Sequence, residues 1–220
     1  MRKTIVAAVA VFAIAGDALA NEPQMNWSGF YAGIDLGGLS AKTPTTIPAL
    51  PITADIEPSG FIAGGHLGYR WHTPGSRWVF GVEADFWGVR AADDAEFVGF
   101  GNSTRVDMNW GGSLRGVAGR AINSTLLYVT GGVAYANFDG CVLSLLGGCW
   151  QSYSDTRLGW TAGLGLAHAF RPNLIARLEY LYSDYGDQSY ATPAVVGGVT
   201  NVEIRTHVLR GGLSWRFATR

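Results

Sequence analysis

The feature that most constrains the fold of this chain is an alternation of apolar and polar residues with a period of two. Near the C-terminal end, for example, Leu178 and Tyr180 alternate with Arg177 and Glu179. Successive side chains of a β-strand point to opposite faces of a sheet, so this period separates the two kinds of residue. The alternation recurs through most of the chain, whereas helical spacing does not. We therefore predict an all-β fold.

The alternating segments are long and few. We predict eight strands, at residues 27–40, 59–72, 77–90, 105–121, 126–139, 156–170, 174–187 and 202–217. They are longer than the five or six residues of a typical strand in a soluble protein. They match the roughly 9–11 residues that a tilted strand needs to cross a bilayer, with a margin at each end.

The segments that connect these strands alternate strictly between short and long. The short turns fall at residues 74–76, 123–125 and 171–173. The long connections fall at residues 41–58, 91–104, 140–155 and 188–201. In an antiparallel up-and-down barrel, this order puts every long connection at one end, and the turns and chain termini at the other. Outer-membrane barrels have short periplasmic turns and longer extracellular loops.

The first twenty residues have the layout of a secretory signal peptide. Arg2 and Lys3 precede an apolar run at 5–14, and a small-residue cleavage pattern follows at 18–20. The run is too short to span a membrane as a helix, which needs roughly 20 apolar residues. We predict a signal peptide at 1–20 and a single β-barrel domain at 21–220.

Composition narrows the class of protein further. Only 15% of the residues are charged, against roughly 25% in soluble domains. The formal net charge of −1 argues against a nucleic-acid partner. The alternation by itself also fits a soluble sandwich with its apolar face inside. Aromatic residues near the strand ends favour the opposite arrangement, because membrane barrels carry aromatic girdles at both interfaces.

A barrel of eight strands is wide enough inside only for side chains. A buried charge without a partner is costly, so the polar faces must carry matched ions. The candidate acids are Asp35, Glu83, Asp85, Asp107 and Glu179. The candidate bases are Arg70, Arg115, Arg177, Arg210 and Arg216. Five against five predicts an interior plugged by ion pairs. The last strand must also pair with the first, because hydrocarbon tolerates no open sheet edge.

Several stretches resemble a known family. They are NWSGFYAGIDLGG (26–38), VFGVEADFWG (79–88), LLYVTGGVAYANF (126–138), GWTAGLGLAHAF (159–170), ARLEYLYSDYG (176–186) and LRGGLSWRF (209–217). They are similar to the small outer-membrane immunogenic proteins of alphaproteobacteria, which are porin-like, eight-stranded barrels of the OmpA-like group. The resemblance implies a Gram-negative outer-membrane location and an envelope-structural or surface-antigen role. Some members are described as porins and some as haem-binding.

The resemblance also implies an assembly signal in the last strand. Its candidate residues are Leu213, Trp215 and Phe217, which the barrel-assembly machinery would recognise. The chain departs from the family in two places. Residues 218–220 follow the final aromatic residue, and Ala167 and His168 stand where members often carry a Glu-aromatic pair.

Other motifs give weaker signals. Cys141 and Cys149 lie within one long connection and predict a disulfide, with two free thiols as the alternative. The four histidines show no metal-ligand spacing, and no Gly-rich run opens a helix, so we predict no metal or cofactor. A lipid-modifying enzyme that uses His207 with Ser214 or Ser183 stays open, although no G-x-S-x-G motif is present.

We therefore predict a structural outer-membrane barrel that displays four loops at the cell surface and is not an enzyme. A narrow diffusion channel is the first alternative, and a lipid-modifying enzyme is a distant second. The predicted partners are outer-membrane lipids and the barrel-assembly machinery. The sequence names no host or surface ligand.

Overall fold

The computed structural model describes residues 25–47, 52–56, 59–91, 96–99, 102–143, 149–192 and 198–217. The predicted signal peptide at 1–20 lies outside these residues. Within the described part of the chain, no helix is long and apolar enough to cross a bilayer.

Eight long strands form the wall of the structure. They are β1 (Gly29–Ile47), β3 (Ser59–His72), β4 (Trp78–Ala91), β6 (Asn102–Ile122), β7 (Thr125–Leu143), β8 (Cys149–Arg171), β9 (Leu174–Thr192) and β10 (Gly198–Arg216). Two short strands, β2 (Ile52–Ile56) and β5 (Glu96–Gly99), pair with β1 and β6 outside the closed ring.

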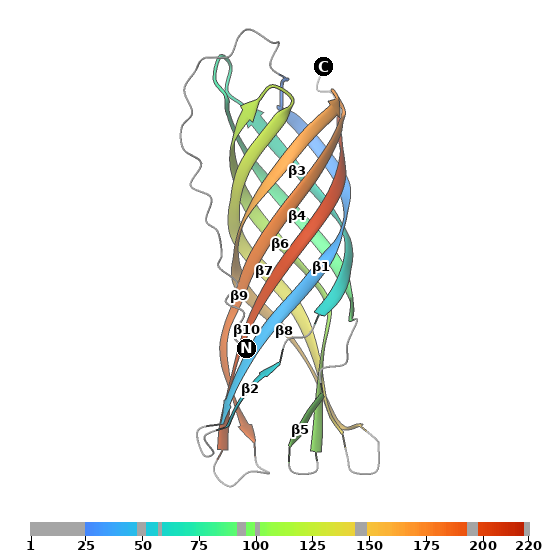
Figure 1. The fold of residues 1–220 in the computed structure, drawn as a ribbon, viewed down its shortest axis with the longest axis vertical. Coiled ribbons are helices and arrows are strands. Elements are labelled where there is room, and N and C mark those ends of the chain that lie inside the picture. Colours follow the sequence, from blue (N-terminus) through green and yellow to red (C-terminus); the bar gives the residue numbers. More distant parts are fainter. Residues whose placement is uncertain are drawn as a thin grey trace, which may run out of the picture.

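Each long strand pairs antiparallel with the next, and the pairing of β10 with β1 closes the sheet (Figure 1). The seam between β1 and β10 runs from Tyr31 opposite Arg216 to Thr46 opposite Asn201. Closure leaves no free edge in the part of the wall that would face hydrocarbon. The prediction of a closed, eight-stranded, up-and-down barrel is confirmed.

Several strands continue well beyond their predicted bounds at the end with the long connections, whereas their bounds at the short turns differ by at most two residues. β1 extends to Ile47, β7 to Leu143 and β9 to Thr192, and β8 begins already at Cys149. Beyond the bilayer a strand faces water on both sides, so it needs no apolar face and loses the period-two signal. The long connections are therefore shorter than predicted.

The outer face of the wall is apolar, as predicted, and the buried charged side chains lie on its inner face. The exposed outward set includes Ile34, Leu67, Phe80, Val129, Leu164 and Leu213. Met108 departs from this alternation. Counted by a period of two from Trp110 it belongs to the outer face, but it packs against buried residues inside the barrel. The register of β6 shifts between Met108 and Trp110, and such a bulge moves the residues before it to the other face.

A second irregularity separates β8 from β9 towards the long connections. Their pairing ends at Trp160 and Asp184. Just beyond, Gly186 has a φ of 73°, and the register between β9 and β10 shifts opposite Glu203 and Arg205. A bulge with glycine in the left-handed region bends the strand that carries it. The bend accounts for the point where β9 leaves β8.

The seam can be tested with a cross-strand disulfide. Ile34 lies opposite Leu213, and both side chains point outward. Residues directly opposite have Cβ atoms about 4.5–5.5 Å apart, close to the reach of a disulfide. In a background with Cys141→Ser and Cys149→Ser, the pair Ile34→Cys and Leu213→Cys is expected to crosslink on mild oxidation. The readout is mass spectrometry of the digested protein.

The matched control pairs Ile34→Cys with Leu209→Cys, which lies on the same face but four residues along β10, about 13 Å away. We expect no crosslink in this control. Equal crosslinking of both pairs would show that the closing register differs from the one described.

Candidate functional site: an ion-pair network inside the barrel

Inside the barrel, a layer of charged side chains lies between apolar clusters. At the end with the short turns lies an apolar cluster that includes Trp27, Val79, Leu126, Tyr128 and Ile175. Towards the other end lies a second apolar cluster, made of Leu39, Ala41, Ile62, Trp87, Leu181 and Val208. Between them, on the same strands, lie the charged side chains. The charges are thus sealed from water on both sides.

Arg115 of β6 binds three carboxylates from two strands. Its Nη2 lies 2.6 Å from Glu83 Oε1 and 2.9 Å from Asp85 Oδ2, both on β4. Its Nη1 lies 3.0 Å from Glu179 Oε1 on β9. The guanidinium of Arg115 therefore joins opposite regions of the wall across the lumen.

Arg177 and Arg210 complete the network. Arg177 binds Asp35 in a bidentate pair, with Nε 2.9 Å from Oδ1 and Nη2 2.7 Å from Oδ2. Its Nη1 lies 2.7 Å from Glu83 Oε2. Arg210 donates to Glu179 Oε2 from Nη2 at 2.6 Å and from Nε at 2.8 Å. The charge on both partners makes these hydrogen bonds roughly twice as strong as neutral ones, and the bidentate Arg177–Asp35 pair also fixes the geometry.

Seven of the ten predicted ion-pair residues therefore meet in one cluster, which we call the ionic layer. They are Asp35, Glu83, Asp85, Arg115, Arg177, Glu179 and Arg210. All seven side chains are buried.

Arg70 lies inside the barrel, but it pairs with no carboxylate among the described residues, contrary to the prediction. Its guanidinium carbon lies 4.3 Å from the centre of the Tyr31 ring, and its Nε and Nη1 have no hydrogen-bond partner. A cation above an aromatic face is stabilised by the ring quadrupole. Tyr31 Oη in turn donates to Glu83 Oε2 at 2.7 Å. Arg70 thus adds a fourth positive charge near the four carboxylates. Tyr31 connects it to them, since its ring contacts Arg70 and its hydroxyl binds Glu83.

The two remaining predictions have different outcomes. Arg216 is only half-buried at the last position of β10 and makes no ion pair within the described residues, so its placement in the network was wrong. It lies beyond the apolar layer, where water solvates its charge. The side chain of Asp107 lies outside the described residues, and its backbone lies opposite Asp139 in the ladder of β6 and β7.

His66 connects β1, β3 and β10 within the ionic layer. Its Nδ1 lies 2.8 Å from Asp35 Oδ2, and its Nε2 lies 2.7 Å from Ser214 Oγ. The order of these contacts is that of a Ser-His-Asp triad. All three residues are buried in the lumen, however, and Asp35 is also held by Arg177. A substrate has no route to Ser214, so the contacts fix the seam of the barrel.

The hydrolase alternative based on His207 is corrected by the faces of the wall. His207 contacts the Tyr180 hydroxyl at 2.6 Å on the outer surface. Ser214 and Ser183 point inward, where they bond to His66 and Thr161. The barrel wall therefore separates this histidine from both serines.

Glycine on the inner face makes room for the network. A Cβ atom on Gly212 would overlap Oδ1 of Asp35, because the carboxylate fills that space. A Cβ on Gly33 would likewise overlap the His66 ring. Glycine in a strand interior often marks such a close approach. The glycines of the inner faces therefore leave the space that the large polar side chains occupy.

Sequence reasoning missed the tyrosines of the interior. Tyr31 and Tyr128 are buried, and their hydroxyls donate to Glu83 and Glu179. The signal was present in the period of two, because Tyr31 shares the inner face of its strand with Asp35.

The predicted disulfide is not tested by the structure. Cys141 lies opposite Ser152, and Cys149 lies opposite Leu143, on the paired strands β7 and β8. The side chains of both cysteines lie outside the described residues. The disulfide stays a prediction.

The candidate assembly signal lies on the outer face. Leu213, Trp215 and Phe217 are exposed there, and the backbone N–H of Phe217 donates to Phe30 at 2.8 Å. Residues 218–220 lie outside the described residues. Recognition by the assembly machinery stays a prediction. No group of three or more potential metal ligands occurs among the residues that the structure describes.

Comparison with known proteins places these features in context. A family model described as "Outer membrane protein beta-barrel domain" matches residues 4–217. The 25 kDa outer-membrane immunogenic protein of Brucella abortus is 31% identical over 200 residues, covering 89% of this chain and 81% of that protein. The 31 kDa outer-membrane immunogenic protein of Brucella melitensis is 27% identical over 243 residues, covering 99% and 100%. Among solved structures, Neisserial surface protein A aligns with a TM-score of 0.49 and 18% identity, covering 86% of this chain and 98% of that one.

Removing one charge from the ionic layer is expected to destabilise the barrel strongly. Glu83→Gln keeps the shape of the side chain but leaves Arg115 and Arg177 short of one negative charge. Breaking a buried ion pair from one side costs about 3–5 kcal/mol. The measurement is urea unfolding of the refolded protein in lipid vesicles, followed by tryptophan fluorescence and by heat-modifiable gel migration.

The matched control is Asp184→Asn. Asp184 lies 3.7 Å from Arg205, whose side chain is 44% exposed. Pairs of this kind contribute at most about 1 kcal/mol. Equal losses of stability in the two variants would contradict the view that the buried ion pairs of the ionic layer stabilise the barrel more than an exposed pair does.

Proposed function

Because the chain belongs to the outer membrane protein β-barrel family, we propose that it serves the outer membrane as a closed structural barrel that displays its long connections at the cell surface. The match also confirms the outer-membrane location and the alphaproteobacterial family that the sequence motifs predicted.

The observation that carries the proposal is the burial of the inward side chains at every level of the lumen. Trp27 at one end, Arg115 in the middle and Ile62 towards the other end are each at most 1% exposed. A water-filled channel would leave inward side chains accessible to water. Wide aqueous pores belong to barrels of 16–18 strands, whereas eight strands enclose only side chains. The filled interior supports a structural role over solute diffusion.

The names of the relatives support the surface role. Several Brucella relatives are called immunogenic outer-membrane proteins, and none of the matched relatives named above is called an enzyme. An immunogenic protein of the outer membrane exposes segments that antibodies reach. In this chain the long connections at one end of the barrel are the candidates for such segments.

Electrical recording separates the closed barrel from the narrow channel. Purified protein inserted into a planar bilayer is expected to give no steady conductance, because the ionic layer and the two apolar clusters fill the lumen. A general porin in the same bilayers serves as the positive control. Steady channels of nanosiemens size, formed by folded protein, would overturn the proposal of a closed interior.

Epitope insertion tests the surface display. A tag placed after residue 195, in the long connection between β9 and β10, is expected to bind antibody on intact cells. A tag placed after Gly75, in the exposed short turn between β3 and β4, is expected to bind only after the outer membrane is permeabilised. Antibody access to the second tag on intact cells would show that the barrel is inserted the other way round.

A further inference from the structure

Beyond the point where β8 and β9 part, each of these strands has one open edge. Their pairing ends at Trp160 and Asp184. Among the described residues, the segment 149–159 of β8 then pairs only with β7, and the segment 187–192 of β9 pairs only with β10. The two strands separate towards the bottom of the view in Figure 1, where the long connections lie. An open edge offers a row of backbone N–H and C=O groups to another strand.

Short strands cover the comparable edges elsewhere at this end of the barrel. The pairing of β1 with β3 ends at Ser40 and Ser59, and β2 then covers the edge of β1. The pairing of β4 with β6 ends at Gly88 and Trp110, and β5 then covers the edge of β6. Proteins cover such edges because an exposed one recruits other chains. Between β8 and β9 no described strand does so.

The connections outside the described residues are shorter than the open edge of β8. The longest are 144–148 and 193–197, and each already joins two strands. Removal of the predicted signal peptide leaves residues 21–24 before Met25, which packs at the end with the short turns. A strand that pairs along the whole segment 149–159 therefore comes from another molecule.

The register of β8 fixes which of its N–H groups point to the open side. The N–H of Ala169 donates to the carbonyl oxygen of Ser124, on the β7 side, at 2.8 Å. Residues 151–168 pair with β7 without a shift, and the hydrogen-bonding groups of successive residues point alternately to the two neighbouring strands. The even-numbered residues therefore point away from β7. Beyond the parting, these include Leu158 and Thr156.

Leu158 presents an apolar side chain beside this edge. It is 76% exposed, more than any other large apolar side chain among the described residues. On the outer face, the adjacent level of the wall carries Asp184 and Arg205, whose side chains pair at 3.7 Å. Charged residues on the outer face are costly within hydrocarbon, so this pair marks its limit. Leu158 follows Trp160 on the side away from the membrane, where lipid does not cover it.

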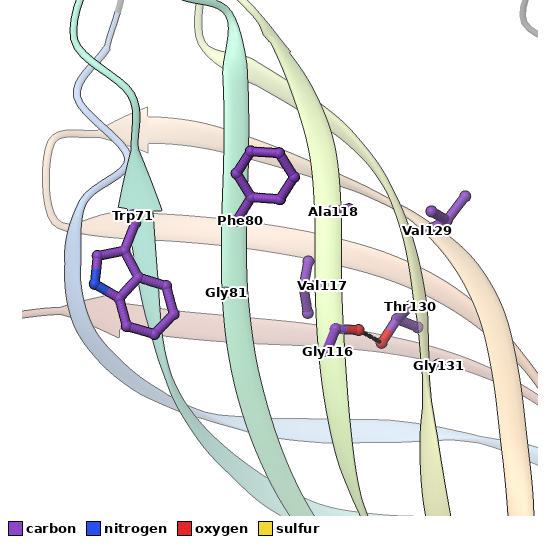
Figure 2. A pocket seen from close by; sticks show the side chains of 9 residues that line it. All are labelled: Trp71, Phe80, Gly81, Gly116, Val117, Ala118, Val129, Thr130 and Gly131. Carbon is purple, nitrogen blue, oxygen red and sulfur yellow. Dashed lines mark hydrogen bonds between the residues drawn. The ribbon is translucent and has the colours of Figure 1, made fainter.

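Exposed apolar side chains elsewhere on the wall have a simpler explanation. Trp71, Phe80 and Val129, for example, flank a hollow over β3, β4, β6 and β7 on the outer face (Figure 2). This part of the wall faces the lipid of the membrane, so its side chains require no protein partner. Leu158 lies beyond that zone and next to unused backbone groups.

We propose that the open edge of β8 binds an extended segment of a partner protein, which adds to the sheet as an antiparallel strand with an apolar side chain against Leu158. Backbone hydrogen bonds to residues such as Leu158 and Thr156 supply the affinity, and the side chain beside Leu158 supplies the selectivity. The partner is a protein outside the cell. This last point alone rests on the surface orientation proposed above.

A second copy of the barrel is the competing occupant. Two copies in one membrane have the same orientation, so a two-fold axis between them runs along the membrane normal. Both copies of β8 then run in the same direction across the membrane, and their pairing would be parallel. Parallel pairing is slightly less stable per residue than antiparallel pairing. Strand direction therefore favours a segment of another protein.

A synthetic peptide with the sequence of residues 134–142 and the change Cys141→Ser tests the proposal. In the barrel this part of β7 pairs antiparallel with β8 from the other side, with Tyr135 opposite Leu158. The labelled peptide is titrated into folded protein in a non-ionic detergent and followed by fluorescence anisotropy. We expect saturable binding of one peptide per barrel and slower hydrogen exchange at the N–H groups of Leu158 and Thr156.

Two variants test the edge itself. Thr156→Pro removes an N–H on the open side and keeps the ladder with β7, because proline is tolerated where the N–H faces solvent. It is expected to weaken peptide binding by about tenfold, the upper range for one hydrogen bond. The matched control Thr156→Ala loses the same side chain, with its hydrogen bond from Asn137, but keeps the N–H, and is expected to bind as wild type does. Leu158→Ser is expected to weaken binding by up to about fivefold, through loss of the apolar cross-strand pair.

A modified peptide is the control on the other partner. Methylation of its backbone nitrogens opposite Leu158 and Thr156 keeps every side chain but prevents pairing, so we expect no binding. Heat-modifiable gel migration verifies that each variant is folded. If Thr156→Pro fails to fold, the methylated peptide tests the pairing on the wild-type protein.

Three results with folded protein would overturn the proposal. They are no saturable binding to wild type up to about 1 mM peptide, equal binding of the plain and methylated peptides, and equal binding by Thr156→Pro and Thr156→Ala. A wild-type dimer that Thr156→Pro makes monomeric would also overturn it, because the edge would then belong to a second copy of the barrel. These measurements use purified protein, so they are independent of the epitope test of orientation.

Discussion

The structure depends on the balance of charge in a lumen that water does not reach. Four buried carboxylates face Arg115, Arg177 and Arg210 at hydrogen-bond distance, and Arg70 adds a fourth positive charge through the Tyr31 ring. Each ion alone would be costly to bury, and a matched set with bidentate geometry offsets that cost. The narrow width of an eight-stranded barrel makes this balance necessary, since no aqueous interior is available to screen the charges.

The same contacts help to close the barrel. Asp35 of β1 receives Arg177 of β9 and His66 of β3, and His66 reaches Ser214 of β10. The strands on either side of the seam are thus joined by side chains in addition to the backbone ladder. The apolar layers above and below keep water from these bonds, and glycines such as Gly33 and Gly212 leave the space that the bonds require. One set of side chains therefore joins the strands at the seam, fills the lumen and balances the buried charge.

The period of two predicted most of the wall, because each strand within the bilayer has one lipid-facing and one lumen-facing side. It also brought seven charged residues to the inner face. It failed where the period breaks or is not needed. The bulge before Trp110 turned Met108 inward, and the strand extensions beyond the bilayer carry no apolar face. A period of two gives the face on which a residue lies but not its position along the barrel axis. Arg216 at the rim and Arg210 in the centre were therefore predicted alike, although only Arg210 is buried.

The central claim is that the buried charges stabilise the barrel as a coupled set, and a double-mutant cycle on Asp35 and Arg177 tests it most directly. The cycle compares Asp35→Asn, Arg177→Met and the double variant by urea unfolding in lipid vesicles. The account predicts that the double variant loses less stability than the sum of the single losses, with a coupling of about 1–3 kcal/mol, as found for residues in one network. Additive losses would contradict it, because they would mean that the two ions stabilise the barrel independently.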